Sequence, residues 1–97
     1  LEVRDDGAPA GLASMYADRA DDTRVRQVAT VAPADTAALG HTSPLARALR
    51  LCTSGTRLLH QADWIAGQLS GRFDVTDENN ALKTGYDPRQ RAWPAWL

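Results

Sequence analysis

The shortage of large apolar side chains limits what this chain can fold into more than any other feature. Leu, Val, Ile and Phe together account for 18 of the 97 residues, just below the roughly 20% at which independent folding becomes doubtful. Eleven basic and 12 acidic residues nearly cancel, so the high net charge that accompanies disorder is missing. Alanine supplies much of the remaining apolar content; it favours helices but buries little area. The sequence therefore predicts a helical chain with a thin core, typical of part of a larger domain.

Charge and hydropathy exclude several classes of partner. A net charge of -1 and an isoelectric point near 6.1 provide no basic field for holding nucleic acid. No apolar run reaches the roughly 18 residues that a membrane span requires, and the first residues lack the layout of a signal peptide. Cys52 is the single cysteine, which fits a reducing compartment. We therefore expect a cytoplasmic protein that binds neither nucleic acid nor membrane.

Turn residues and apolar spacing divide the first half of the chain. Residues 1–11 are polar and contain Gly and Pro, which predicts a loop or a frayed end. Residues 12–16 are a short apolar stretch and predict a strand. Val25 and Val28 share one face of a predicted helix over residues 19–31. A further turn of helix is predicted over residues 35–39, ending at a glycine.

The second half has clearer helix signals. Ser43 is a good N-cap and Pro44 suits the first helical position, so a helix is predicted from there to Cys52. A longer helix is predicted from residue 55 to Leu69 and should end at Gly71. Its apolar stripe consists of Leu58, Leu59, Ala62, Ile65, Ala66 and Leu69. Thr76 is predicted to cap a short helix that runs to Lys83, and residues 86–88 should form a turn.

Residue chemistry alone marks no active site. His41 and His60 lie too far apart in the sequence to form a metal-ligand pair, and Cys52 on an apolar helix face is interpreted as an inert thiol. The acidic residues at 74, 77 and 78 lack the spacing of a calcium loop and are better explained by helix capping. Trp93 and Trp96 are interpreted as a small hydrophobic cluster or docking surface rather than a ligand platform. No phosphate-binding glycine loop is present.

The segment from residue 60 to residue 97 carries three motifs in a fixed order. Residues 60–71 read HQADWIAGQLSG and resemble the ADW-x-x-G-x-LTG helix of FGGY-family carbohydrate kinases. Residues 77–88 read DENNALKTGYDP, and residues 91–97 read RAWPAWL; both resemble the segments that follow in that family. The residues of these motifs most resemble those of the branch that includes D-ribulose kinases and xylulokinase-like proteins. Upstream, residues 15–18 (MYAD) and 43–51 (SPLARALRL) match more weakly but in the right order.

The resemblance implies an α/β fold, namely part of a ribonuclease-H-like (actin-like ATPase) domain, with this stretch mostly helical and one or two short strands. It identifies residues 1–97 as an internal fragment of the N-terminal, sugar-binding domain. The whole enzyme would use ATP and Mg²⁺ to phosphorylate a hydroxyl of a ketopentose or related polyol. The catalytic aspartate and the nucleotide domain would lie outside this chain, so the fragment should bind neither cofactor and be inactive alone. Its partners would be the sugar and the remainder of the kinase chain.

Two residues are candidates for sugar contact by this resemblance. Tyr16 falls where relatives place an aromatic ring against the substrate, and Asp18 follows it. A buried tyrosine and a helix-capping aspartate are the alternative interpretation of this pair. The other motif residues are expected mainly to fix backbone geometry and packing: Asp63, Trp64, Gly71, Asp77, Asn80, Ala81, Gly85 and Asp87.

Two other functions are compatible with the sequence. One is a stand-alone helical module that binds a protein partner through its apolar face. The other is a degenerate kinase relative that has lost catalysis. The flanking reading frame distinguishes both from an active kinase, since an active kinase requires a phosphate hairpin upstream and a catalytic aspartate downstream.

Overall fold

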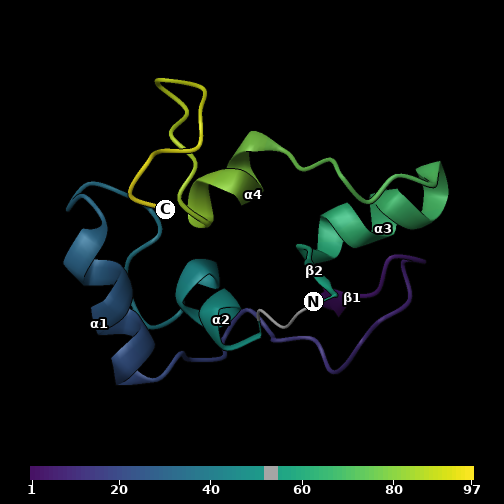
Figure 1. Cartoon of the computed structure of the whole chain (residues 1–97), viewed down its shortest axis with the longest axis horizontal. Helices are drawn as coiled ribbons and strands as arrows, with labels where there is room; N and C mark the ends of the chain where they lie inside the picture. Colours follow the sequence, from purple (N-terminus) through teal and green to yellow (C-terminus); the bar gives the residue numbers. More distant parts are fainter. Residues whose placement is uncertain (52–54) are drawn as a thin grey trace.

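Four short helices and one two-stranded sheet make up the regular structure of residues 1–51 and 55–97, the part of the chain that the computed structural model describes (Figure 1). The predicted end of one helix at Cys52 lies outside these residues. In chain order the elements are β1 (Glu2–Val3), α1 (Asp22–Val31), α2 (Pro44–Leu51), β2 (Arg57–Leu58), α3 (Gln61–Ser70) and α4 (Glu78–Lys83). The regular structure is thus mostly helical with short strands, as the sequence predicted.

The sheet joins the N-terminal segment to the middle of the chain. β1 and β2 pair antiparallel, with Glu2 opposite Leu58 and Val3 opposite Arg57. The Leu1 amine extends this pairing by donating to the Leu59 carbonyl at 2.9 Å. Val3 is completely buried. Residues 1–11, for which a loop or frayed end was predicted, therefore contain a strand and are held at their start by the sheet.

α1 and α2 pack against each other around a cluster of small side chains. The buried members are Ala20, Val28 and Ala46. α1 begins three residues later than predicted because Asp21 is its N-cap, and the Asp21 carboxylate accepts from the Arg24 amide at 3.0 Å. This hydrogen bond satisfies an amide that the helix itself leaves unpaired.

The predicted N-terminus of α2 is confirmed. Pro44 is its first residue, and the Ser43 hydroxyl oxygen accepts from the Leu45 amide at 3.2 Å. The same hydroxyl donates to the carbonyl of Ala38, and Ser43 is buried. Ser43 therefore caps α2 and ties it to the preceding loop.

Three predicted elements differ in the structure. Residues 12–16 are irregular rather than a strand, and residues 35–39 form turns rather than a helical turn. The helix predicted from residue 55 is replaced at its start by β2, and α3 begins only at Gln61. Helix propensity in residues 57–59 is overridden because β1 offers these residues hydrogen bonds across the sheet.

The ends of α3 and α4 follow local capping rules. Gly71 ends α3 as predicted: it adopts a left-handed conformation with φ 73°, and its amide donates to Gly67 at 2.8 Å. The cap of α4 is Asp77 rather than the predicted Thr76, since the Asp77 carboxylate accepts from the Asn80 amide at 2.9 Å. Thr76 instead donates to Asp63.

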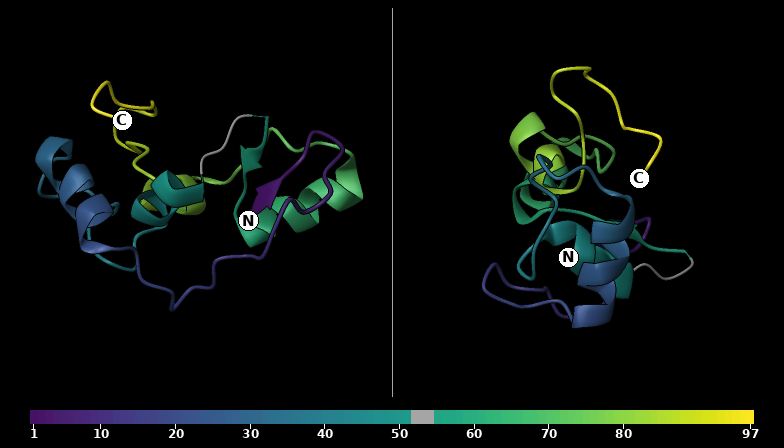
Figure 2. Two further views of the ribbon diagram at one scale, coloured as in Figure 1. Left: turned by 60° about the horizontal axis from the view of Figure 1, so that its bottom comes forward. Right: turned by 90° about the vertical axis from the view of Figure 1, so that its left-hand side faces the viewer.

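The elements spread over an elongated, thinly packed body. α1 lies at one end, and α3 with the sheet lies at the other (Figure 2). The chain measures 36 × 29 × 24 Å and exposes 6507 Å², whereas a compact monomer of this mass exposes about 5,400 Å². Among the described residues the buried apolar side chains are two valines and four alanines. No helix in the described ranges is long and apolar enough to cross a bilayer.

The first prediction concerns the C-terminus of α3. Gly71→Ala should destabilise the chain by about 1 kcal/mol, because a Cβ is disfavoured in the left-handed conformation. The measurement is the midpoint of urea unfolding, followed by circular dichroism. Gly11→Ala is the matched control, since Gly11 lacks a positive φ and has open space at its Cβ position. Equal losses for both variants would contradict the assigned role of Gly71.

Candidate functional site

The loop that carries the two predicted sugar contacts is built by internal hydrogen bonds. The Asp18 carboxylate accepts from the Met15 amide at 2.7 Å and from the Ser14 hydroxyl at 3.4 Å. From α2, the Arg47 guanidinium donates to the Met15 carbonyl and to the Ser14 hydroxyl. Residues 14–18 therefore form a fixed turn that is anchored to α2.

Tyr16 is the side chain that this turn presents to solvent. It is 90% exposed, and the neighbouring Met15 is also exposed. The interpretation of Tyr16 as a buried core residue is therefore wrong. Asp18 is exposed as well, but its carboxylate is used by the turn, and it does not cap a helix. The arrangement can offer an aromatic face to a ligand, while Asp18 shapes the loop.

The motif residues of α3 connect this helix to the rest of the chain. Asp63 is buried, with 7% of the residue exposed, and one of its carboxylate oxygens accepts a hydrogen bond from the Thr76 hydroxyl at 2.8 Å. The Trp64 indole donates to the Gly7 carbonyl at 2.9 Å, and the Gln68 amide donates to the same oxygen at 3.0 Å. α3 thus binds the N-terminal segment through Trp64 and Gln68, and it binds the segment before α4 through Asp63.

Phe73 packs between two glycines. A methyl group placed at either Gly7 or Gly67 would overlap the Phe73 ring. Gly7 also has φ +80°, a conformation that suits glycine,. The glycine of the ADW-x-x-G motif is therefore needed for close approach of an aromatic ring to the helix backbone.

The residues of the second motif organise α4 and the C-terminal hook, which we define as residues 84–97. Asp77 caps α4 and also accepts from the Asn80 side chain at 2.7 Å, while Ala81 is buried. Gly85, at φ +106°, leaves room for Trp96. Asp87 accepts from the Arg89 and Gln90 amides at 2.8 and 3.1 Å. Each of these residues makes a local contact or is buried within α4 or the hook.

The two tryptophans of the C-terminal hook have different neighbours. Trp93 meets Tyr86 edge-on, with ring centroids 5.2 Å apart, and is 53% exposed. Trp96 lies over Gly85. The interpretation as a small aromatic cluster thus applies to Trp93 with Tyr86 rather than to the tryptophan pair.

The structure separates the two sets of candidate residues. Tyr16 and Asp18 lie on the loop held by α2, whereas the motif residues surround α3 and α4. Within residues 1–51 and 55–97, no hydrogen bond or ion pair joins this loop to a motif residue. The candidate residues therefore do not form a single site.

The pKa shifts have local, structural causes. Burial lowers the pKa of His60, which occupies the N-cap position of α3. A hydrogen bond from the Arg24 amide lowers the pKa of Asp21. Hydrogen bonding between Arg72 and Asp74 raises the pKa of the arginine and lowers that of the aspartate. These groups are caps or a surface ion pair, and none of them faces a candidate reaction centre.

Metal ligands are not brought together in the described part of the chain. No group of three His, Cys, Asp or Glu side chains there has the proximity to hold an ion. His41 instead lies 3.7 Å from the Asp22 carboxylate at the start of α1.

A cleft of about 150 Å³ lies between the loop after α1 and the C-terminal hook. Its walls include Trp96 and three prolines, and two further lining residues, Arg89 and Asp35, form an ion pair at 3.6 Å. Both members of this ion pair are exposed, so it contributes little stability. The cleft marks where the hook rests on the α1–α2 half of the molecule.

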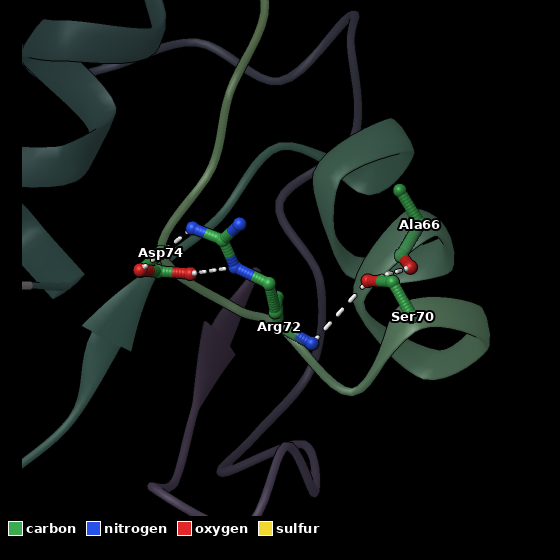
Figure 3. Close-up of polar contacts among 4 residues, drawn as sticks. All are labelled: Ala66, Ser70, Arg72 and Asp74. Carbon is green, nitrogen blue, oxygen red and sulfur yellow. Dashed lines mark hydrogen bonds and ion pairs between the residues drawn. The ribbon is translucent and has the colours of Figure 1, made fainter.

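A broader groove of about 500 Å³ runs along α3. One wall is formed by α3 residues and the other by residues that follow the helix; the lining consists of Ala62, Asp63, Ala66, Ser70, Arg72, Val75, Thr76 and Asp77. At its end the Ser70 hydroxyl donates to the Ala66 carbonyl at 2.7 Å and accepts from the Arg72 amide at 3.3 Å (Figure 3). Arg72 in turn forms a two-pronged ion pair with Asp74, at 3.2 and 3.3 Å. The groove therefore has a fixed polar end and an apolar floor.

No protein-family model matches the chain.

Sequence reasoning missed two residues that organise these sites. Phe73 lies outside the three motifs, although its position between two glycines is central to the packing. Arg47 lies within the weakly matching residues 43–51 and was given no role, yet it anchors the Tyr16 turn. The signal for Phe73 was present: it is the single Phe of the sequence and follows two motif glycines. No local pattern indicated the reach of Arg47 across 32 positions.

The second prediction tests the packing of Phe73. Gly67→Ala should destabilise the chain by about 1–3 kcal/mol through overpacking, although the same change in an exposed helix stabilises by up to about 1 kcal/mol. The double variant Gly67→Ala/Phe73→Ala should lose less than the sum of the two single variants. Urea unfolding provides the measurement. A stabilising Gly67→Ala would show that the ring does not occupy this position.

The third prediction concerns the Tyr16 turn. Asp18→Ala removes the acceptor of the Met15 amide, so hydrogen exchange at that amide should accelerate by roughly tenfold, corresponding to a hydrogen bond of about 1.5 kcal/mol. Amide exchange followed by NMR reports this directly. Tyr16→Ala is the control and should leave the rate unchanged, because Tyr16 makes no contact that holds the turn. An unchanged rate in Asp18→Ala would rule out the assigned role.

Proposed function

We propose that this chain belongs to the sugar-binding domain of an FGGY-type carbohydrate kinase, and that its fold is part of a ribonuclease-H-like domain. The observation that carries the proposal is the run of three motifs over residues 60–97 in one order and spacing. The geometry supports it because the motif residues have distinct structural tasks: Asp63 accepts from Thr76, Gly67 admits Phe73, and Gly85 admits Trp96. Such tasks require these residue types at this spacing.

The proposed reaction is transfer of the ATP γ-phosphate to a hydroxyl of a ketopentose or related polyol. In such transfers Mg²⁺ neutralises charge on the phosphates, and positioning supplies most of the rate. The described residues include no carboxylate cluster suited to MgATP, and Asp77 and Asp87 are engaged by backbone amides. The proposal therefore places the nucleotide, the metal and the catalytic aspartate in the remainder of a cytoplasmic polypeptide.

Tyr16 is the residue of this chain that we assign to the sugar. An exposed aromatic ring packs well on the C–H face of a sugar, and the turn fixed by Asp18 and Arg47 limits the entropy lost on binding. Asp18 is assigned a positioning role through this turn. A ring held in this way would orient a sugar without taking part in proton transfer.

An exposed apolar face favours one alternative, the stand-alone interaction module. Ile65 is 47% exposed and Leu69 is 87% exposed, which is unusual for large apolar residues on one helix face. The module would use this face to bind another protein and would consume no ATP. A reading frame with start and stop signals immediately around these 97 residues would favour it.

The fourth prediction tests the kinase proposal with a coupled ADP assay. The 97-residue chain should show no sugar-dependent ADP release with D-ribulose or D-xylulose, whereas the longer reading frame that contains it should show it with at least one sugar of a panel. In that longer protein, Tyr16→Ala should raise KM roughly 2- to 10-fold, the value of one aromatic contact. Tyr16→Phe retains the ring and is the matched control.

Two outcomes would overturn the proposal. Turnover by the pure 97-residue chain would contradict the division of tasks between this chain and the remainder of the kinase. A longer protein that releases no ADP with any polyol or sugar would contradict the kinase assignment itself.

A further inference from the structure

The tip of the C-terminal hook, residues 87–92, is a turn that is closed on itself. Asp87 and Ala92 exchange two backbone hydrogen bonds at 3.0 and 3.2 Å, and the Asp87 carboxylate accepts from the amides of Arg89 and Gln90. The tip projects away from α4 (Figure 1), and residues 88–92 are all exposed. No backbone hydrogen bond joins it to any other described part of the chain. The backbone therefore builds the tip, and side chains must position it.

Two arginines of the tip form ion pairs with two different parts of the molecule. The Arg89 guanidinium lies 3.6 Å from the Asp35 carboxylate, in the loop after α1. The Arg91 guanidinium lies 3.8 Å from the Glu78 carboxylate, at the start of α4. All four side chains are between 60% and 85% exposed. The tip thus bridges the loop after α1 and α4 through charges that stand in solvent.

The backbone of Arg91 supports a role for its charge. With φ 51°, Arg91 is the one non-glycine residue of positive φ within residues 1–51 and 55–97. A side chain is disfavoured in this conformation, which glycine adopts at lower cost. Such outliers concentrate where the surrounding structure uses the residue. A glycine at this position would relax the turn but would lose the ion pair with Glu78.

The contact between the tip and the loop after α1 has little besides charge to hold it. Residues 87–89 and residues 33, 35 and 36 line the 150 Å³ cleft from opposite parts of the chain, and none of them is buried. The cleft is also smaller than the roughly 300–1,000 Å³ of ordinary small-molecule sites. Exposed ion pairs weaken with salt, because the screening length falls from about 30 Å at 0.01 M to about 3 Å at 1 M. The closed position of the tip is therefore sensitive to ionic strength.

We propose that the hook tip is an ionic strap, which holds the cleft closed at low ionic strength and releases it at high ionic strength. The released tip swings about the neck of the hook, where Tyr86 meets Trp93 edge-on at 5.2 Å. The hydrogen bonds between Asp87 and Ala92 persist, because they lie within the moving unit. Release widens the cleft beside Thr36. The strap involves residues 33–36 and 78–93 alone, and it holds whether or not the chain is part of a kinase.

The test is a sodium chloride titration of the 97-residue chain, followed by NMR. The amide shifts of residues 33–36 and 87–92 should move along one line, from the closed state in low salt toward the open state of the repulsive variant Asp35→Arg. Between about 0.01 M and 1 M salt, the ratio of closed to open tip should fall roughly 1.5- to 5-fold, the effect of one exposed ion pair. Arg89→Gln in low salt should reproduce this fall, and the charge-swapped Asp35→Arg/Arg89→Asp should reverse it.

Arg72→Gln is the matched control, because it removes another exposed ion pair, the one with Asp74, and should leave the tip in place. An Arg89→Gln variant whose shifts at residues 33–36 match the wild type would overturn the proposal, and so would an equal response to Arg72→Gln. The nuclear Overhauser contact between Tyr86 and Trp93 decides what moves. Its persistence in high salt supports a swinging tip, whereas its loss together with the closed state means that the hook unfolds, which also overturns the strap.

Discussion

The contact of Phe73 with two glycines is the interaction on which the arrangement of this chain depends. The ring touches the backbone of Gly7 from the N-terminal segment and of Gly67 from the middle of α3. It thereby brings the Gly7 carbonyl within reach of Trp64 and Gln68. Because these hydrogen bonds come from one side of α3, they set the rotation of the helix about its axis. The orientation of the apolar face is a consequence of this packing, and so is the groove beside residues 72–77.

The motif residues have structural rather than chemical tasks in this chain. Asp63, Asp77 and Asp87 are carboxylates, but each accepts hydrogen bonds from its own chain. Their value lies in shaping turns and helix ends rather than in proton transfer. Tyr16 differs from them, because the turn that carries it is fixed while the ring itself is exposed. A rigid backbone with a free aromatic ring is suited to orienting a ligand, which is the limited contribution that we assign to this part of the proposed kinase.

Local rules predicted the helix ends better than the strands. Ser43 with Pro44, and Gly71, act through hydrogen bonds or φ values of their immediate neighbours, so the sequence near them was sufficient. β1 and β2 pair across more than 50 positions, and no local pattern in residues 2–3 or 57–58 signals that contact. The anchoring of the Tyr16 turn by Arg47 was not predicted for the same reason, because the two are far apart in the sequence. The outward turn of the apolar stripe on α3 follows from the packing of Phe73 against Gly67 and was not expected.

The alanine-rich interior affects how mutagenesis of this chain should be interpreted. Ala20, Ala38, Ala46 and Ala81 make up most of the buried apolar set among the described residues. Alanine scanning truncates side chains, so it leaves these four positions untouched and would report a protein with almost no sensitive interior. Substitution by a larger residue such as leucine probes them instead, because close-packed interiors have no room for added methylene groups. For this chain, a scan that adds volume is the informative one.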